Sequence, residues 1–282
     1  MKKFIAMILA LVMVFALCAC GNNGDGNDTK KEAGVVTADD LKEGFTLKVG
    51  FDPEFPPFGY LAADGSYDGF DLALAKEVCN RLGWGFEAVP INWDAKTEEL
   101  KAGNVNCLWN GFTYTGREDQ FTWSDPYYEN EIVMVVKADS GITSFADLAG
   151  KKVMAQADSS AVTALNRSKL KDTIGEVVEL GDYQMGFMEL DQGSVDAVAV
   201  DIGVAISQMN KTGNEDAYVI LNEKLSPEQY AIGFLLGNEA LRDAVSAELK
   251  NMADDGTMLK IAQSSDYVQQ GLVVDSLCMI SK

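Results

Sequence analysis

The segment from Glu99 to Asn110 recurs without gaps between Glu189 and Val200. Each copy reads as the end of a helix, then a glycine (Gly103 or Gly193), then an apolar run that is typical of a buried strand. Helices and strands that alternate along a chain form parallel sheets covered by helices. Two such copies, this far apart, predict an α/β protein with two lobes, although a chance match of a common helix–glycine–strand pattern is an alternative.

The ends of the two repeated strands predict where a ligand binds. Ligands of open α/β sheets lie beyond the carboxyl ends of the strands. With the copies in register, Gly111 follows the first strand where Asp201 follows the second. We therefore expect Gly111 and Asp201 to face one cleft.

A polar loop, NGFTYTGREDQFTWSDPY, follows the first of these strands from Asn110 to Tyr127. Its arginine, Arg117, lies in the loop and not on a charged helix face. A guanidinium matches a carboxylate with two hydrogen bonds, and the hydroxyls of Thr113 and Thr115 add polar contacts. The loop predicts a site for a small anion; the alternative is that these residues only solubilise it.

Local patterns predict the elements around these copies. The strand Thr46–Phe51 leads into a proline-rich loop that is a candidate edge of the site, and the next helix is expected from Asp71 to Leu82 with Asp71 as its cap. Two β-rich runs, Glu131–Lys137 and Tyr230–Leu236, are the segments that can carry the chain from one lobe to the other and back.

A second candidate for anion binding lies after the predicted strand Lys152–Ala155. This strand ends in Gln156-Ala-Asp-Ser-Ser160, and a helix follows. Backbone N–H groups at such a strand-to-helix turn favour an anionic group. Ser159 has the alternative role of capping this helix, and the two roles are compatible.

The amino terminus has the pattern of an export signal, with two lysines and an apolar run from Phe4 to Leu17 that is short for a membrane-spanning helix. The run ends in Leu17-Cys18-Ala19-Cys20, which resembles the lipobox of bacterial lipoproteins. This implies cleavage after residue 19 and a lipid on Cys20; an ordinary cleaved signal is the alternative. Residues 20–40 lack apolar periodicity and predict a disordered tether, with folding from about Leu41.

The composition excludes several classes of function. A formal net charge of -20 argues against nucleic acid as a partner, because phosphate binding needs a basic surface. The chain has no histidine, which excludes triads and metal sites that depend on one. Cys79, Cys107 and Cys278 follow the signal without CxxC spacing, so at most one disulfide forms, and we expect neither a metal nor a cofactor.

Four motifs, together with the lipobox, resemble the family 3 extracellular solute-binding proteins of polar amino acid ABC transporters. The motifs are GFDPEFPPF from Gly50, DGFDLALAKE from Asp68, TYTGR from Thr113 and SDPY from Ser124. The resemblance covers about Leu41 to Gln263. It implies two Rossmann-like lobes joined by two hinge strands, as in type II periplasmic binding proteins, with lobe 1 at residues 41–132 and 232–282 and lobe 2 at residues 133–231.

The resemblance implies a binding protein and not an enzyme. Such a protein captures a free amino acid, here with a polar side chain expected, and delivers it to the permease subunits of an ABC transporter. We expect a monomer, held by its lipid on the outer face of the bacterial cell membrane, which is periplasmic if the source is Gram-negative.

The resemblance also assigns the end of the site that holds the ligand's side chain. Phe55 and Trp93 would pack on the ligand. Asp52 would line the side-chain pocket, and Gln156 of the second lobe would reach into it. The carboxylate of Asp52 favours a polar or cationic side chain.

The end that holds the α-amino and α-carboxylate groups is implied in the same way. Backbone groups of Asn110 and Gly111 and the hydroxyl of Thr113 would meet these groups, and Arg117 would clamp the carboxylate. The sequence departs from the family here, because Thr113 to Arg117 reads TxTxR where the family usually has TxTxxR. One residue is therefore missing from the loop before Arg117.

The second lobe is expected to supply Ser159 and Ser160 for the carboxylate and Asp201 for the ammonium. Two other functions remain open. A cleft enzyme of the same fold, of the dehydratase or lytic transglycosylase type, needs a positioned acid or base, whereas Asp52 and Asp201 are already explained as ligand partners. A ligand sensor for a membrane receptor is the other alternative.

Overall fold

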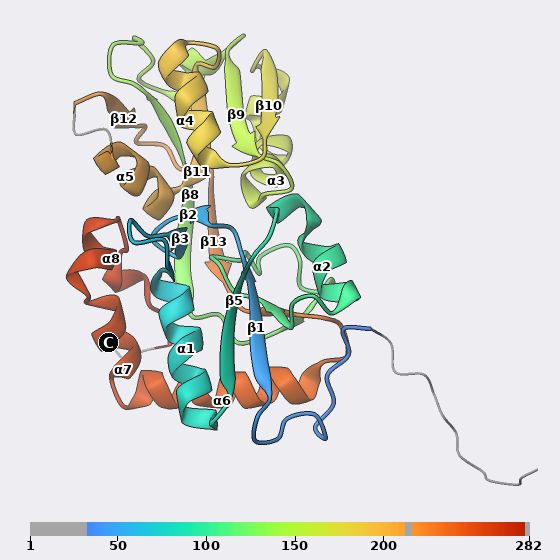
Figure 1. Cartoon of the computed structure of the whole chain (residues 1–282). Helices are drawn as coiled ribbons and strands as arrows, with labels where there is room; N and C mark the ends of the chain where they lie inside the picture. Colours follow the sequence, from blue (N-terminus) through green and yellow to red (C-terminus); the bar gives the residue numbers. More distant parts are fainter. Residues whose placement is uncertain (1–32, 212–215, 280–282) are drawn as a thin grey trace, which may run out of the picture. The chain divides into compact units, whose positions relative to one another are not determined.

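The structure, a computed structural model, describes residues 33–211 and 216–279. These residues belong to one compact unit, Glu32–Lys282 (Figure 1). The predicted signal peptide, Cys20 and the tether up to residue 32 lie outside the described residues. Within the described part of the chain, no helix is both long enough and apolar enough to cross a membrane.

The first lobe is built around a mixed five-stranded sheet. Its strands are, in spatial order, β5 (Gly85–Pro90), β1 (Thr46–Phe51), β6 (Cys107–Leu108), β14 (Gly233–Phe234) and β7 (Thr122–Trp123). β1 pairs in parallel with β5 and β6, whereas β14 runs antiparallel to β6 and β7. Along the sequence, between β1 and the first helix, the chain forms a three-stranded sheet of β2 (Glu54–Phe55), β3 (Gly59–Leu61) and β4 (Tyr67–Asp68).

Helices from both ends of the chain pack in this lobe. α1 (Phe70–Leu82) contacts β1 and β5, and α6 (Glu239–Asp254) contacts α1 and β7. α7 (Thr257–Ala262) packs on α1 and α6, and α2 (Lys96–Ala102) packs on β6 and on the short 3-10 helix η1 (Trp93–Ala95). The chain then forms α8 (Ser265–Gln269) and η4 (Val274–Ser276).

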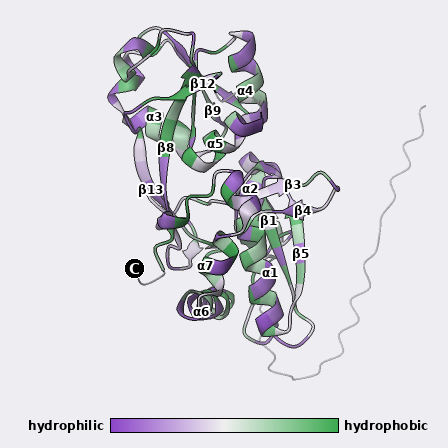
Figure 2. Ribbon diagram, turned by 90° about the vertical axis from the view of Figure 1, so that its left-hand side faces the viewer, coloured by the Kyte–Doolittle hydropathy of each residue, from purple (hydrophilic) through white to green (hydrophobic). Residues whose placement is uncertain are grey.

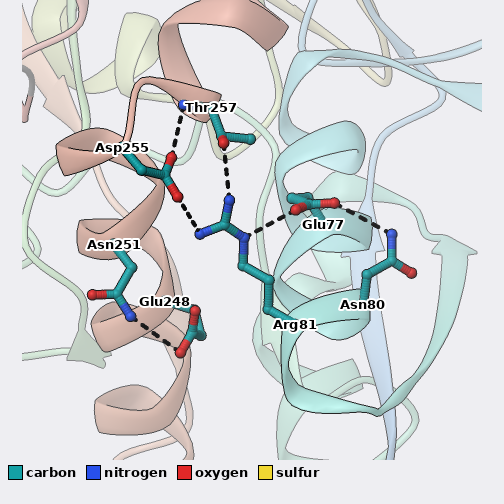
Figure 3. A network of polar contacts seen from close by, with 7 residues as sticks. All are labelled: Glu77, Asn80, Arg81, Glu248, Asn251, Asp255 and Thr257. Carbon is teal, nitrogen blue, oxygen red and sulfur yellow. Dashed lines mark hydrogen bonds and ion pairs between the residues drawn. The ribbon is translucent and has the colours of Figure 1, made fainter.

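A polar network joins α1 to the turn between α6 and α7 (Figure 3). Arg81, in the last turn of α1, bonds to Glu77 at 2.9 Å and to Asp255 at 2.7 Å. It also donates to the hydroxyl of Thr257 at 2.9 Å. One guanidinium thus connects segments that are far apart in the sequence, and it holds the pKa of Asp255 down at about 2.

The second lobe contains a six-stranded sheet. Its order is β10 (Glu176–Leu180), β9 (Lys152–Gln156), β11 (Ala197–Asp201), β8 (Tyr128–Lys137) and β12 (Tyr218–Ile220), with β13 (Ser226–Tyr230) also paired to β8. β10, β9 and β11 are parallel, and β8 is antiparallel to β11, β12 and β13. The predicted two-lobed α/β fold is confirmed.

Helices cover both faces of this sheet. Side chains alternate along β9, so that Val153 and Ala155 share a buried cluster with α3 (Ser160–Arg167), whereas Met154 packs in the cluster that contains α4 (Tyr183–Gln192). The sulfur of Met154 would lie 2.4 Å from a Cβ placed on Gly186 of α4, so Met154 would have to move if this residue carried a side chain. α5 (Ile202–Lys211) packs on β8 and β11, and the short 3-10 helices η2 (Phe145–Leu148) and η3 (Lys169–Asp172) lie in the connections.

The repeat predicted from the sequence is a structural repeat. α2 and α4 end at glycines with nearly the same left-handed backbone angles, φ 74° and ψ 16° at Gly103 and φ 74° and ψ 18° at Gly193. The next residue in each copy donates its N–H to the corresponding carbonyl, with Asn104 on Glu99 at 3.1 Å and Ser194 on Glu189 at 3.0 Å. Such caps satisfy helix carbonyls that otherwise lack partners.

The equivalence continues into the neighbouring strands. Asn106 and Asp196 accept the backbone N–H of Lys48 at 2.8 Å and of Lys152 at 2.9 Å. Each then donates its own N–H back to the carbonyl of the same lysine, at 2.8 and 2.9 Å. A chance match of a common pattern does not produce matching side-chain contacts, so the alternative interpretation is wrong.

β8 and β13 are the strands that pass between the two sheets, as both views show (Figures 1 and 2). They pair antiparallel from Tyr128 opposite Tyr230 to Ile132 opposite Ser226. The first β-rich run was predicted correctly, but the second was not, because β13 ends at Tyr230 and Gly233–Phe234 belongs to the first sheet. Among the described strands β13 pairs with β8 alone, apart from a single bridge between Tyr230 and Thr113, so Pro227 is tolerated on this edge.

The fold also includes residues that we assigned to the tether. The N–H of Val36 donates to the side chain of Asn238 at 2.9 Å, and Asn238 donates to the carbonyl of Gly34 at 2.9 Å. Val36 is buried against the first lobe. The folded part of the chain therefore includes residues before Leu41. Hydrogen bonds from the start of α6 hold this segment, and residues 33–40 have no apolar periodicity that would predict them.

Candidate functional site

The ends of the two repeated strands lie at one cavity. Its wall is formed by residues from both lobes, namely Phe55, Trp93, Asn110, Gly111, Phe112, Thr113, Arg117, Gln156, Ser159, Ser160 and Asp201. Every predicted site residue except Asp52 is among them, and Phe112 is an addition. Asp52 lies next to the cavity, because its carboxylate accepts the side-chain N–H of Gln156 at 2.5 Å.

Three contacts between the lobes close this cavity. Lys96 of α2 forms a salt bridge with Asp158, in the turn between β9 and α3. Arg117 donates to the carbonyl of Asp158 at 3.3 Å, and Gln156 donates to Asp52. The remaining volume is about 10 Å³, which is space for about one water molecule. An amino acid therefore enters only if these contacts open.

Arg117 is the cation of the site. Its guanidinium donates to two carbonyls, those of Thr113 and Asp158, each at 3.3 Å, and lies 5.4 Å from the ring centre of Phe112. Among the described residues it forms no ion pair. Burial lowers its pKa, while the nearby carboxylates of Glu228, Asp158 and Asp201 act in the opposite direction. The guanidinium of Arg117 can therefore still form a charge-assisted hydrogen bond with a bound anion.

Asp201, the last residue of β11, is the opposite charge of the site and is only 3% exposed. It accepts hydrogen bonds from the side chain of Asn130 at 2.7 Å and from the hydroxyl of Tyr230. Burial raises its pKa, and these hydrogen bonds act in the opposite direction. No described cation bonds to it, so the side chains that donate hydrogen bonds to its carboxylate are neutral.

The side-chain end combines a buried carboxylate with aromatic rings. Burial raises the pKa of Asp52 to about 6, although the N–H of Glu54 and the amide of Gln156 lower it. The ring of Phe55 lies between Phe58 and Tyr183, with centroids at 5.9 and 6.0 Å. This end has no bound cation among the described residues, so a cationic or hydrogen-bonding group can be accommodated there.

Asp71 has a different role from the one expected. It does not cap α1, because the cap position is taken by Gly69, whose φ of 140° and close approach to the carbonyl of Phe58 exclude a side chain. Asp71 is fully buried instead and accepts the N–H of Gly111 at 2.6 Å and the hydroxyl of Tyr127 at 2.7 Å. Burial raises its pKa to about 7.

This contact changes what Gly111 can do. Its N–H is already engaged by Asp71, so of the backbone groups of Gly111 the carbonyl is the one left for the predicted ligand contact. Gly111 has a φ of 55°, and a Cβ there would lie 2.7 Å from the ring of Phe55. Glycine is therefore required to bring the chain past Phe55.

The strand-to-helix turn predicted after β9 is present, and Ser159 has the alternative role of a helix cap; anion binding at this turn stays a prediction. The hydroxyl of Ser159 accepts the N–H of Val162 at 3.4 Å and caps α3. Ser160 is the first residue of α3, and both serines line the cavity. Asp158, with a φ of 54°, is the one described non-glycine residue with positive φ, and this sharp turn points its carbonyl toward Arg117.

Comparison with known proteins decides the family. The model of the bacterial extracellular solute-binding proteins, family 3, matches residues 47–265. This chain belongs to that family. The L-cystine-binding protein TcyA of Bacillus subtilis (strain 168) is 30% identical over 268 residues, which is 93% of this chain and 97% of TcyA. The arginine-binding extracellular protein ArtP of the same organism is 28% identical over 263 residues, 93% of this chain and 96% of ArtP.

Solved structures of binding proteins are similar over most of this chain. An ABC uptake transporter substrate-binding protein from Streptococcus pneumoniae with bound histidine has a TM-score of 0.76 at 29% identity, covering 81% of this chain and 94% of that one. An ancestral arginine-binding protein bound to arginine has a TM-score of 0.73 at 35% identity, covering 79% and 98%. These relatives are binding proteins by name.

Besides Phe112, sequence reasoning missed four residues of this family 3 protein. Lys96 and Asp158 bridge the lobes, and Asn130 and Glu228 surround Asp201 on the crossing strands. Glu228 accepts from Asn130 at 2.9 Å and from the hydroxyl of Thr113 at 3.1 Å. A charged residue in a β-rich run was the available signal for Glu228, but the run was placed too late in the chain to include it.

Proposed function

We propose that this protein captures one free amino acid between its two lobes and delivers it to the permease of an ABC transporter. The observation that carries the proposal is the placement of Arg117 and Asp201, one from each lobe, at the same cavity without an ion pair among the described residues. An α-amino acid brings one carboxylate and one ammonium, which are the two charges that this pair lacks. The binding of amino acids by the relatives supports the same function.

Each wall of the cavity has a role in this proposal. The α-carboxylate binds Arg117, with Ser159 and Ser160 on the other side, and the α-ammonium binds Asp201. Asn110 and Thr113 offer polar groups between these ends, whereas Phe55 and Trp93 pack on the aliphatic part. The side chain of the ligand takes the place of the bond between Gln156 and Asp52.

Asp52 favours a ligand with a polar or cationic side chain. A buried carboxylate whose pKa is raised by desolvation gains most from a partner that carries a positive charge. The relatives named above bind cystine, arginine and histidine, each of which has polar groups beyond its Cβ. We place the lobe boundaries at residues 132/133 and 231/232, so that β8 and β13 act as the hinge.

The function is tested by a thermal-shift screen of the twenty amino acids with ornithine and cystine, followed by calorimetry of the best ligand. At a ligand concentration of about 100 times Kd, binding stabilises the folded protein by roughly 2.7 kcal/mol and raises Tm accordingly. We expect such a shift for polar or cationic amino acids, at one site per chain. The absence of a shift for the whole panel would contradict the proposal.

The proposed location is the outer face of the cell membrane, where a monomer is anchored by lipid on Cys20. Each buried methylene of an acyl chain contributes about 0.8 kcal/mol, so removal of the lipid removes the anchor. We expect Cys20→Ser to move the protein from the membrane fraction to the soluble extracytoplasmic fraction, with Cys18→Ser as the control. Membrane association of Cys20→Ser with a cleaved signal, checked by mass, would mean that another element anchors the protein.

A further inference from the structure

Glu228 stands out because it is a buried acid that the proposed function does not use. It lies on β13, one of the strands between the lobes, and is only 6% exposed. Its carboxyl group accepts from Thr113 at 3.1 Å and from Asn130 at 2.9 Å. Glu228 and Ser160 also line one neighbouring pocket together. Thr113 and Ser160 both line the cavity, so Glu228 lies directly behind its wall.

Glu228 and Asp201 form a pair of carboxyl groups. The amide nitrogen of Asn130 donates to both of them, to Asp201 at 2.7 Å and to Glu228 at 2.9 Å, so two buried carboxyl groups share one donor. Two ionised carboxylates this close repel each other, and a proton on one of them removes the repulsion. A pair of this kind titrates as a unit.

We propose that the Asp201–Glu228 pair holds one proton, and that this proton leaves to solvent when the α-ammonium of the ligand binds beside Asp201. The inference rests on the proposed function. The protonated protein binds the cationic ammonium group of the ligand. The complex forms with release of one proton, which the buffer takes up. Glu228 acts as a positioning residue, because it reaches the ligand through Asp201 and Thr113.

None of the other charged or titratable groups described around the pair forms an ion pair that would neutralise it in place of this proton. Arg117 forms no ion pair with either acid among the described residues, and Lys96 is engaged by Asp158. Tyr183 of α4 and Tyr230 of β13 face the pair, and burial raises the pKa of both hydroxyls. Tyr128 of β8 stacks on Tyr230 at 5.7 Å, and burial raises its pKa to about 12.

The raised pKa of Glu228 agrees with its position beside Asp201. Burial first, and then the charge of Asp201, raise the pKa of Glu228 from 4.5 to about 8. The pair therefore holds its proton at neutral pH. A cation beside Asp201 favours the doubly ionised pair and lowers this pKa, so binding releases about one proton near pH 7.

Calorimetry of the wild-type protein with the best amino acid of the panel tests the release. The binding enthalpy is measured at pH 7 in phosphate and in Tris, whose ionisation enthalpies differ. We expect a difference that corresponds to about one proton released per ligand, and an affinity that increases up to tenfold per pH unit between about pH 6 and 8. Equal enthalpies in the two buffers for a ligand that binds would overturn the inference and leave the proposed function standing.

Glu228→Gln identifies the group. It keeps the shape but cannot ionise, so proton release and the pH dependence due to the pair should both disappear. Glu129→Gln, an exposed acid on β8, is the matched control and should behave as wild type. If the Glu228→Gln variant still releases about one proton, the proton comes from another group, for example Asp52, whose pKa is about 6.

A measurement without ligand separates this inference from the proposed function. The folded-state pKa of Glu228 lies above the unfolded value, so Glu228 contributes a loss of stability to the wild-type protein as pH rises from about 4.5 through 8, and Glu228→Gln lacks this contribution. We expect the Tm of the variant relative to wild type to increase between about pH 5 and 8.5. A constant difference would show that the pair holds no proton. If the variant does not fold, loss of a protonated-carboxyl infrared band when the ligand is added to wild type decides the same question.

Discussion

We expect the replacement of Arg117 with lysine to weaken amino acid binding by roughly 30-fold or more, because in the closed site the ligand's carboxylate loses its bidentate partner. Truncating one partner of a buried, hydrogen-bonded charge pair typically costs about 2–5 kcal/mol, which is about 30-fold to several thousand-fold in Kd. Lysine keeps the charge but loses the planar fork that binds both carboxylate oxygens. Calorimetry of the variant with the best ligand measures the loss.

The ligand's α-amide and an unrelated arginine provide the controls for this variant. The amide lacks the carboxylate charge, so it should bind wild type weakly and discriminate little between wild type and Arg117→Lys. Arg242→Lys changes an arginine of α6 that bonds to Asp243 and to the carbonyl of Trp123, and should retain the affinity of wild type. If Arg117→Lys binds within about threefold of wild type, less than 1 kcal/mol, Arg117 is not the carboxylate clamp.

Replacing Asp201 with asparagine should cause a loss of similar size, about 2–5 kcal/mol, for the same physical reason at the other end of the ligand. Asparagine retains the shape and an acceptor oxygen for Asn130 and Tyr230, so a large effect reports the lost charge. The N-acetyl analogue, which has no ammonium, should bind wild type poorly and lose little further in the variant. Comparable affinities of Asp201→Asn and wild type for the free amino acid would place the ammonium elsewhere.

The part of the site that could be predicted from the sequence is the part that follows from periodic elements. The helix–glycine–strand repeat located Gly111 and Asp201 at two strand ends, and the resemblance added Arg117, Gln156 and the serines after β9. All of these line one cavity. The shortened loop before Arg117 leaves the guanidinium within reach of the opposite lobe, as its bond to the carbonyl of Asp158 shows.

The residues that could not be predicted depend on tertiary pairing. Glu228 approaches Asp201 because β13 pairs with β8 in one particular register, and β8 also pairs with β11. Asp71 has the position of a helix cap in the sequence, but the chain buries it under the loop after β6, where it bonds to Gly111. In both cases the partner lies far away in the sequence, and a local pattern carries no information about which carboxylate it will meet.

The connectivity of the two sheets has a consequence for the order in which the fold can be completed. β8 to β13 form one continuous stretch of chain, so the second sheet has all its strands once Tyr230 is present. The first sheet has a gap between β6 and β7 until β14 arrives, since Gly233 pairs with both Leu108 and Trp123. Its covering helices α6 and α7 come later still. When the chain is synthesised from its amino terminus, the first lobe therefore begins first and is completed last. Its early strands stay unpaired along one edge until residues more than a hundred positions away are present.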